Sequence, residues 1–439
     1  MENKNLKKDI GLFMATMLVC GNMIGSGVFM LPATLADVSG PLATIIAWIL
    51  TTIGSVLVAI SFANLGTKFP QTGGAYQYVK EAFGEFAGFL SAWLYWNGSW
   101  IGNAAILVTL TSYSATIFPI LNNPFYSIIY SSIILWAVTI LNIIGVKQAG
   151  KIQSFTTVFK IVFFTLFIIV AFLNFNKGNF MPLLPEGKGL DTVSLAATTT
   201  LWAFIGLESS TVAAGEIKDP EKNIKRSTIY GLIISAVIYL SISIASMGAM
   251  PNELLAKSTS PLTDILTRVL GSSIGIIITF IVIISILGTT IGWILATARV
   301  SYAAGQDGVF PKIFAIVSKK YNTPVYSLVI SSILVNILLL TNYQKNMVSA
   351  FSFITLLATL SYLPVYLLTV SAEIMIMFRS EKKISIGRFI GKSIIPLLGF
   401  IYTVWTIYGS GAETVMWGFI LMLLGIPFYI YNYHKNRMV

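Results

Sequence analysis

The sequence has little of the side-chain chemistry on which most enzymes and metal proteins depend. Its 439 residues include one cysteine, Cys20, and one histidine, His434. A single cysteine excludes an internal disulfide framework and a CxxC metal site. A single histidine near the end of the chain argues against a Ser-His-Asp site and against histidine-ligated zinc. We therefore expect no catalytic residues, no metal and no cofactor.

Charged residues are also scarce. Asp, Glu, Lys and Arg together make up 10% of the chain, whereas about 25% is usual for a soluble globular protein. Hydrophobic residues make up 56%, and the mean hydropathy is +0.81. A disordered chain is excluded as well, because disorder goes with low hydrophobicity and high charge. The composition predicts an all-α polytopic membrane protein.

Twelve stretches are apolar enough to cross a bilayer, which takes about 20 residues of helix. They lie at 11–36, 41–65, 86–117, 125–146, 152–175, 192–215, 228–250, 272–304, 325–342, 347–378, 391–409 and 412–433. We expect one integral membrane domain over 1–439, because no stretch resembles a soluble domain. The first stretch lacks the cleavage pattern of a signal peptide. We expect a multi-pass protein of a bacterial inner membrane, in contact with the lipid bilayer.

The positions of the basic residues predict the orientation of the spans. With the N-terminus in the cytoplasm, 22 of the 28 lysines and arginines fall in cytoplasmic segments and five fall outside. Cytoplasmic loops of membrane proteins carry such an excess of Lys and Arg. We therefore expect both termini in the cytoplasm. The topology also explains the net charge of +11, so no nucleic-acid partner is needed.

Two spans are interrupted at matching positions. The first contains GNMIGSG at 21–27, and the sixth contains WAFIGLESS at 202–210. Paired interruptions of this kind are the best sequence indication of a transporter site between two inverted repeats. We expect repeat one over about 11–175, repeat two over about 192–378 and two extra helices over about 391–433. The alternative is that these glycines are packing contacts between helices.

A few polar and aromatic residues lie deep within spans. Glu208 is the one acidic residue well inside a span by these boundaries, and a carboxylate there usually marks a substrate path or a proton relay. The alternative is a structural carboxylate bonded to the freed backbone. Trp202 and Trp293 lie away from the interfaces where Trp normally collects, and their ring faces attract cations. Asn103 is a mid-span amide that needs a partner.

Taken together, these residues resemble the basic amino acid/polyamine antiporters of the amino acid–polyamine–organocation superfamily. The similarity extends over nearly the whole chain and is greatest to the arginine/agmatine branch. The similar stretches are GNMIGSGVFMLPATLA at 21–36, TGGAYQYV at 72–79, WIGN at 100–103, LWAFIGLESSTVAAG at 201–215, GW at 292–293, DGVFPKIFA at 307–315 and GSGAETVMWG at 409–418.

The resemblance implies a LeuT-like fold of twelve transmembrane helices, with a five-plus-five inverted repeat and broken helices 1 and 6. It implies a homodimer that exchanges extracellular arginine for intracellular agmatine. Because agmatine carries one more positive charge, each cycle coupled to a decarboxylase exports a proton equivalent and serves acid resistance. The small-molecule partners are then a basic amino acid and its decarboxylated amine.

The resemblance also implies roles for individual residues. Met23, Ser26 and the Gly25–Gly27 backbone would hold the α-carboxylate and amine. The guanidinium end would be lined by Gly98, Ser99, Asn103, Ile106 and Ile205. Trp202 would close the outer side, and Trp293 would be a middle gate. Tyr95 and Glu208 would form the inner gate, with Glu208 also a candidate pH sensor.

Three positions depart from the family pattern. Leu357 stands where the family has a serine in the tenth helix. The family tyrosine after the tenth-helix proline is displaced, so that Tyr366 is the candidate gate residue. Lys160 resembles the fifth-helix lysine of proton-coupled transporters of the superfamily. It would either stabilise the broken first helix and contribute to coupling, or extend toward the cytoplasm.

Other functions stay open at this point. An ornithine/putrescine exchanger, a lysine/cadaverine exchanger and a proton-coupled amino acid symporter would share the same fold. A membrane receptor would need a soluble output domain, and an intramembrane enzyme would need a recognisable catalytic set. The sequence shows neither, so we expect a transporter and not an enzyme.

Overall fold

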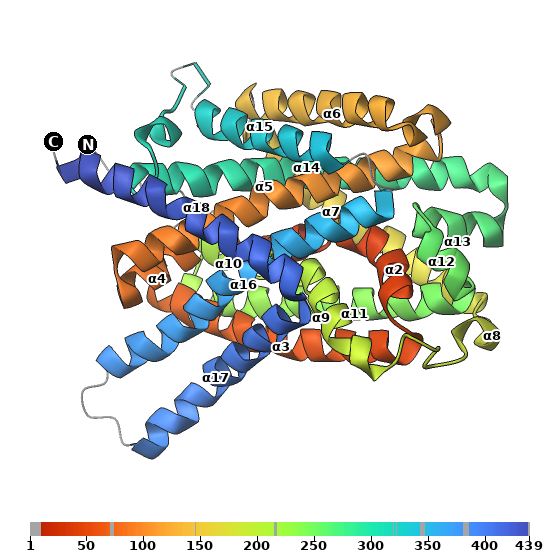
Figure 1. Cartoon of the computed structure of the whole chain (residues 1–439), viewed down its shortest axis with the longest axis horizontal. Helices are drawn as coiled ribbons and strands as arrows, with labels where there is room; N and C mark the ends of the chain where they lie inside the picture. The colour runs from red at the N-terminus through yellow and green to blue at the C-terminus, as the bar shows by residue number, and fades with distance from the viewer. Residues whose placement is uncertain are drawn as a thin grey trace.

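The computed structural model describes residues 10–70, 74–144, 146–214, 217–318, 320–321, 323–342, 347–380 and 386–437. The longer helices are α1 (Leu12–Met23), α2 (Gly27–Val38), α3 (Pro41–Lys68), α5 (Glu85–Ala115), α6 (Pro124–Ile144), α7 (Val146–Leu173), α9 (Val193–Leu201), α11 (Pro220–Ala249), α14 (Ser272–Gln306), α15 (Val325–Asn342), α16 (Met347–Ser380), α17 (Ile386–Gly409) and α18 (Ala412–Arg437). They form an elongated bundle (Figure 1).

Shorter elements occupy the connections and the interrupted sixth span. They are α4 (Ala75–Phe83), α8 (Lys177–Phe180), α10 (Ser209–Val212), α12 (Asn252–Lys257), α13 (Pro261–Leu270), and the 3-10 helices η1 (Pro119–Asn122), η2 (Leu190–Thr192), η3 (Trp202–Phe204) and η5 (Lys312–Ala315). Across the described ranges, the one β-type contact is an isolated bridge between Ile10 and Ile217. The expected all-α class is confirmed for this part of the chain. Helix α4 was not expected from the sequence, because its apolar residues are too few to read as a span.

Within the described residues, nine spans are long and apolar enough to cross a membrane, and the bent pair α1–α2 makes a tenth. This confirms a multi-pass membrane protein. Proline at the first position begins α3, α6, α11 and α13, where its missing N–H would in any case have no partner in the helix.

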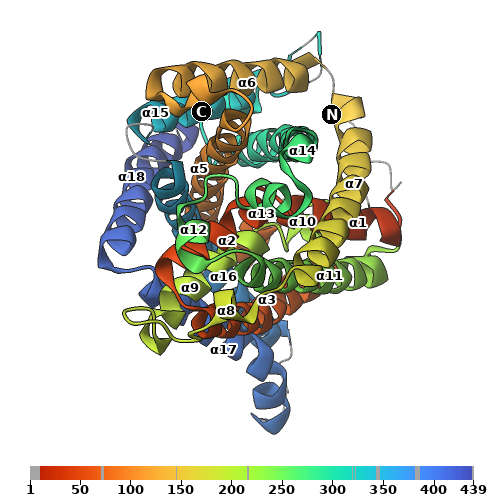
Figure 2. The ribbon, with the colours of Figure 1, turned by 90° about the vertical axis from the view of Figure 1, so that its right-hand side faces the viewer.

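The bundle has central and peripheral helices (Figure 2). In the apolar part of α16, 67% of residues are buried, whereas the figure for α18 is 11%. Most side chains of α5 are also buried, including a run from Ile101 to Ala115. An apolar helix that is exposed along its length fits contact with lipid. The core therefore lies around α5 and α16, next to the interrupted helices, and α17 and α18 lie outside it.

The connections cluster at two ends of the bundle, as the alternation of spans requires. Hydrogen bonds at one end join Ile10 to Lys218, Gln77 to Asp307, Glu81 to Arg379 and Val309 to Asn432. Hydrogen bonds at the other end join Ala36 to Lys188 and Asn252, Leu42 to Leu183, Asn176 to Gly248 and Ser112 to Thr259. The first set comes from segments expected in the cytoplasm and the second from segments expected outside. The predicted orientation depends in part on basic residues that lie outside the described residues, among them Lys4, Lys7, Lys8, Lys319, Lys382 and Lys383.

Both expected helix interruptions are present. Helix α1 ends at Met23 and α2 begins at Gly27, with a bend of 40° between them. In the sixth span, α9 gives way to η3, and the chain then turns through Gly206, whose φ is +106°, before α10. A glycine is needed there because other residues rarely adopt positive φ. Backbone without helical hydrogen bonds at membrane depth survives only where protein or a cavity satisfies it.

Candidate functional site

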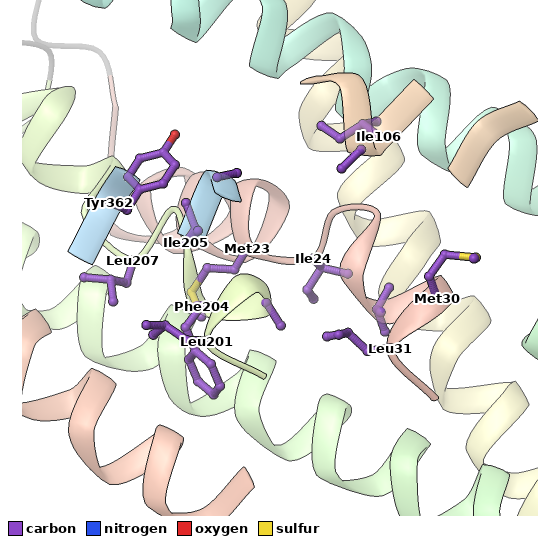
Figure 3. Close-up of a cluster of buried hydrophobic side chains, with 14 of the residues drawn as sticks. Met23, Ile24, Met30, Leu31, Ile106, Leu201, Phe204, Ile205, Leu207 and Tyr362 are labelled. Atoms are coloured by element: carbon purple, nitrogen blue, oxygen red, sulfur yellow. The ribbon is translucent and has the colours of Figure 1, made fainter. Parts of the chain in front are cut away.

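A cavity lies where the two interruptions meet, with about 340 Å³ of space that protein atoms do not fill, counting the part open to solvent. Its walls come from α1, the α1–α2 break, α5, η3, α14 and α16. The lining residues are Asn22, Met23, Gly25, Ser26, Gly27, Ser99, Gly102, Ile106, Trp202, Ile205, Trp293 and Tyr362. Figure 3 shows Met23, Ile205 and Tyr362 approaching one another from three separate elements. A largely apolar cavity with a few polar groups is typical of a small-molecule site.

The α1–α2 break provides polar groups on one side of the cavity. The Ser26 side chain is 1% exposed, and its hydroxyl has no hydrogen-bond partner among the described residues. The first turn of α2 also has no side-chain cap. The N–H groups that begin a helix lack partners within it, and they carry the positive end of the helix dipole. This side of the cavity is suited to a carboxylate.

The Trp202 indole lines the cavity and lies between two glycines of different helices. A Cβ atom at Gly27 would lie 2.9 Å from Cδ1 of the indole, and one at Gly102 would lie 2.8 Å from its Cη2. Neither position could therefore carry a side chain without displacing the ring. The two glycines hold the indole between α2 and α5.

Two hydrogen bonds tie the interrupted segments to each other and to α14. The Trp293 indole N–H donates to the Asn22 carbonyl at 3.1 Å, and the Asn22 amide donates to the Ser209 hydroxyl at 2.8 Å. Gly206 approaches the end of α1 so closely that a Cβ would lie 3.1 Å from the Asn22 carbonyl carbon. The two breaks are thus in direct contact with each other, and Trp293 of α14 is bonded to the first of them.

Glu208 follows the second break and is not among the residues that line the cavity. Its Oε1 accepts from the Tyr95 hydroxyl at 2.8 Å, and its Oε2 accepts from the Tyr366 hydroxyl at 3.0 Å and the Gly206 N–H at 3.2 Å. The carboxylate is fully buried. Tyr95, which contacts Glu208, precedes Gly102, which contacts Trp202, by seven residues on α5. These two contacts therefore lie about 10 Å apart along that helix.

Lys160 of α7 contacts the α1–α2 break but does not line the cavity. Its ammonium donates to the Ile24 carbonyl at 3.2 Å and to the Thr289 hydroxyl of α14. The side chain is 1% exposed, so the alternative in which it extends to the cytoplasmic surface is wrong. The ammonium binds a carbonyl that the helix break has freed, and it joins α7 to α14 at that point.

Nine of the expected substrate-contacting residues line the cavity: Met23, Gly25, Ser26, Gly27, Ser99, Ile106, Trp202, Ile205 and Trp293. Gly98 and Asn103 do not. Gly98 lies under the Tyr362 ring, and the Asn103 amide donates to the Thr297 hydroxyl at 3.0 Å. Leu357 is also absent from the lining.

Sequence reasoning missed three lining residues, namely Asn22, Gly102 and Tyr362. Asn22 and Gly102 stand inside the similar stretches and could have been selected from them. Tyr362 carries no comparable signal, since its ring is one of many in an aromatic-rich chain. Across the described part of the chain, no group of three or more His, Cys, Asp or Glu side chains could hold a metal ion.

Comparison with known proteins gives a consistent family picture. The sequence model of the amino acid permease family matches residues 10–430. A Bacillus subtilis protein named "Putative arginine/ornithine antiporter" is 31% identical over 98% of this chain and 99% of its own length. The arginine/agmatine antiporter of Chlamydia abortus is 32% identical over 98% of this chain and 91% of its own. The putrescine transporter PotE of Haemophilus influenzae is 26% identical over 97% of each chain.

Proposed function

This chain belongs to the amino acid permease family, and from that premise we propose that it exchanges extracellular arginine for intracellular agmatine. Its relatives are transporters rather than enzymes. The observation that carries the proposal is the cavity between the two helix breaks. The Ser26 hydroxyl, which has no partner among the described residues, and the indole rings of Trp202 and Trp293 border this cavity. A helix start and indole faces together suit a molecule that carries both a carboxylate and a cationic group.

The proposal includes a complete topology. Twelve transmembrane helices, five of them in each of two inverted repeats, account for the described helices when α1–α2 and α9–η3–α10 each count as one span. Both termini are cytoplasmic, in a bacterial inner membrane. Within this topology α5 runs outward, so Trp202 closes the external side and Glu208 closes the internal side. A homodimer is included on the resemblance alone.

The proposed residue roles follow this orientation. Ser26, Met23 and the backbone of Gly25 and Gly27 bind the α-carboxylate and amine. Ile106, Ile205 and Ser99 contact the rest of the substrate. Trp202 is the outer gate.

The remaining roles concern gating. Trp293 is the middle gate. Tyr95, Glu208 and Tyr366 form the inner gate, and Glu208 senses pH through its two tyrosine partners. A neutral carboxyl would hold these hydroxyls less firmly than the charged form does. A cavity whose described lining contains no carboxylate binds a dication without trapping it, as exchange requires.

Counterflow in proteoliposomes tests the exchange. Vesicles loaded with agmatine should take up labelled arginine at acidic external pH, whereas empty vesicles should not. Vesicles loaded with putrescine, ornithine or lysine compare the alternative exchange pairs directly. If arginine uptake proceeds only with internal ornithine, the agmatine assignment is wrong and the arginine/ornithine pair of the Bacillus relative's name replaces it.

The contacts of Lys160 favour one second candidate, a proton-coupled amino acid symporter. A lysine that joins the α1–α2 break to α14 could link a change of its charge to movement of the broken helix. Uptake into empty vesicles driven by an imposed proton gradient would support this candidate. Lys160→Ala should then abolish the accumulation. A Lys160→Ala variant that accumulates the amino acid as the wild type does would exclude a symporter coupled through this lysine.

A further inference from the structure

Three tyrosines surround the buried carboxylate, but they do not have the same partners. Tyr95 and Tyr366 donate to Glu208. Tyr362 packs edge-on against Tyr95, with ring centroids 5.0 Å apart, and its hydroxyl lies 2.7 Å from the Ser99 hydroxyl. Of the three, Tyr362 alone lines the cavity. It is therefore the tyrosine that a bound molecule would meet.

The direction of the Tyr362–Ser99 hydrogen bond can be deduced. The Ser99 hydroxyl already donates to the Tyr95 carbonyl at 2.8 Å. A serine hydroxyl has one proton to donate. When Ser99 donates to that carbonyl it accepts from Tyr362, and this arrangement gives both hydroxyl protons a partner among the described residues. It uses the only proton of the phenol. The Tyr362 oxygen keeps its lone pairs and can accept a hydrogen bond, but it has no further proton to offer.

The position of the Tyr362 ring is set by Gly98. A Cβ atom at Gly98 would lie 2.7 Å from Cε2 of the ring and 2.8 Å from its Cδ2, and 3.2 Å from the Ser361 Cβ. The ring therefore lies directly on the α5 backbone, in space that any other residue at position 98 would fill. A side chain at this position would push the ring away from α5.

Glu208 itself cannot readily serve as the acceptor for a substrate. Both of its oxygens already accept hydrogen bonds, and the carboxylate is not part of the described cavity lining. A cationic group entering this end of the cavity reaches the Tyr362 oxygen as a neutral acceptor with a free lone pair. Cations with N–H groups satisfy such an acceptor, and neutral aliphatic chains do not.

We infer that Tyr362 determines substrate specificity in two ways. Its phenol oxygen accepts an N–H from the distal cationic group of the substrate, and its ring on Gly98 limits how long that substrate can be. The inference rests on the proposed function and names the ligand class at this end of the cavity: an amino acid or amine with a terminal guanidinium or ammonium.

Tyr362→Phe tests the acceptor. Purified protein is titrated with arginine, and with norleucine as a neutral competitor that has the same α-groups and no distal N–H. Loss of a hydrogen bond to a charged donor should raise the Kd for arginine about tenfold or more, with the Kd for norleucine unchanged. Tyr239→Phe is the matched control, because the Tyr239 hydroxyl is buried without a described partner. Equal losses for both ligands, or no loss for arginine, would overturn the acceptor role.

Gly98→Ala tests the length limit without removing the hydroxyl, and it also serves if Tyr362→Phe does not fold. Displacement of the ring into the cavity should favour ornithine over the longer arginine, by about tenfold in the ratio of Kd values. An unchanged ratio would overturn the length limit. If the wild-type protein binds none of these amino acids, the proposed function fails and the inference fails with it. If the wild type binds arginine and both variants match it, only the inference fails.

Discussion

The hydrogen bonds to Glu208 should control how often the cavity opens toward the cytoplasm. Tyr366→Phe removes the 3.0 Å hydrogen bond to Oε2 and leaves that of Tyr95 to Oε1 in place. A hydrogen bond to a charged group stabilises a folded arrangement by about 1.5–3 kcal/mol. Since about 1.4 kcal/mol corresponds to a factor of ten in an equilibrium constant, the population open at this end should rise roughly 10- to 100-fold.

A cysteine placed in the cavity can report that opening. Ile205 lines the cavity and is 4% exposed, and the native Cys20 is fully buried, so Ile205→Cys provides the reactive thiol. A membrane-impermeant maleimide is added to inside-out or right-side-out vesicles. Labelling from the cytoplasmic face should accelerate about tenfold or more in the Tyr366→Phe background, with little change from the external face.

The control is Tyr239→Phe in the same reporter background. That substitution removes a buried hydroxyl that has no partner among the described residues, and it should leave both labelling rates unchanged. The gate role of Tyr366 would be refuted if its variant labelled at the control rate. It would also be refuted if labelling rose equally from both faces, since that would indicate general loosening of the bundle.

Three further perturbations follow from the same geometry. Glu208→Gln cannot change charge, so the pH dependence of exchange should flatten; a wild-type pH profile with normal affinity would contradict the sensor role. Lys160→Met removes two buried hydrogen bonds and should lower the thermal midpoint of the purified protein, with an unshifted midpoint arguing against stabilisation of the break. Gly102→Ala would place a methyl 2.8 Å from the Trp202 ring and should weaken arginine binding about tenfold, whereas Gly391→Ala, which has open space around it, should not.

Much of the architecture could be predicted because membrane insertion constrains the sequence strongly. Long apolar runs predicted the bounds of most spans to within a few residues. The glycines at 21–27 located the break that the structure has between Met23 and Gly27. Glu208 stood out because carboxylates are costly in a bilayer. Three glycines fall within seven residues of the first span, in the spacing GxxxGxG at 21–27, so a local pattern was enough to locate this break.

The partners of these residues could not be predicted, because they are far away in the sequence. Tyr362 meets Ser99 across 263 positions, and Lys160 meets Ile24 across 136. Periodicity indicates which face of a helix is buried, but it does not say which other helix lies opposite. Gly98 illustrates the difficulty: the family pattern suggested substrate contact, whereas in the structure a tyrosine ring from α16 lies against it.

The packing of Trp202 between Gly27 and Gly102 has a consequence for how related sequences can diverge. Each glycine is within 3 Å of the indole, measured from the Cβ that it lacks. Neither glycine can be replaced while the tryptophan stays in position, and a smaller residue at 202 would leave a void on both sides. Replacing one of these three residues alone disturbs the packing, whereas replacing them together need not do so. These three positions should therefore covary among homologues as a single unit, although they belong to three different segments of the chain.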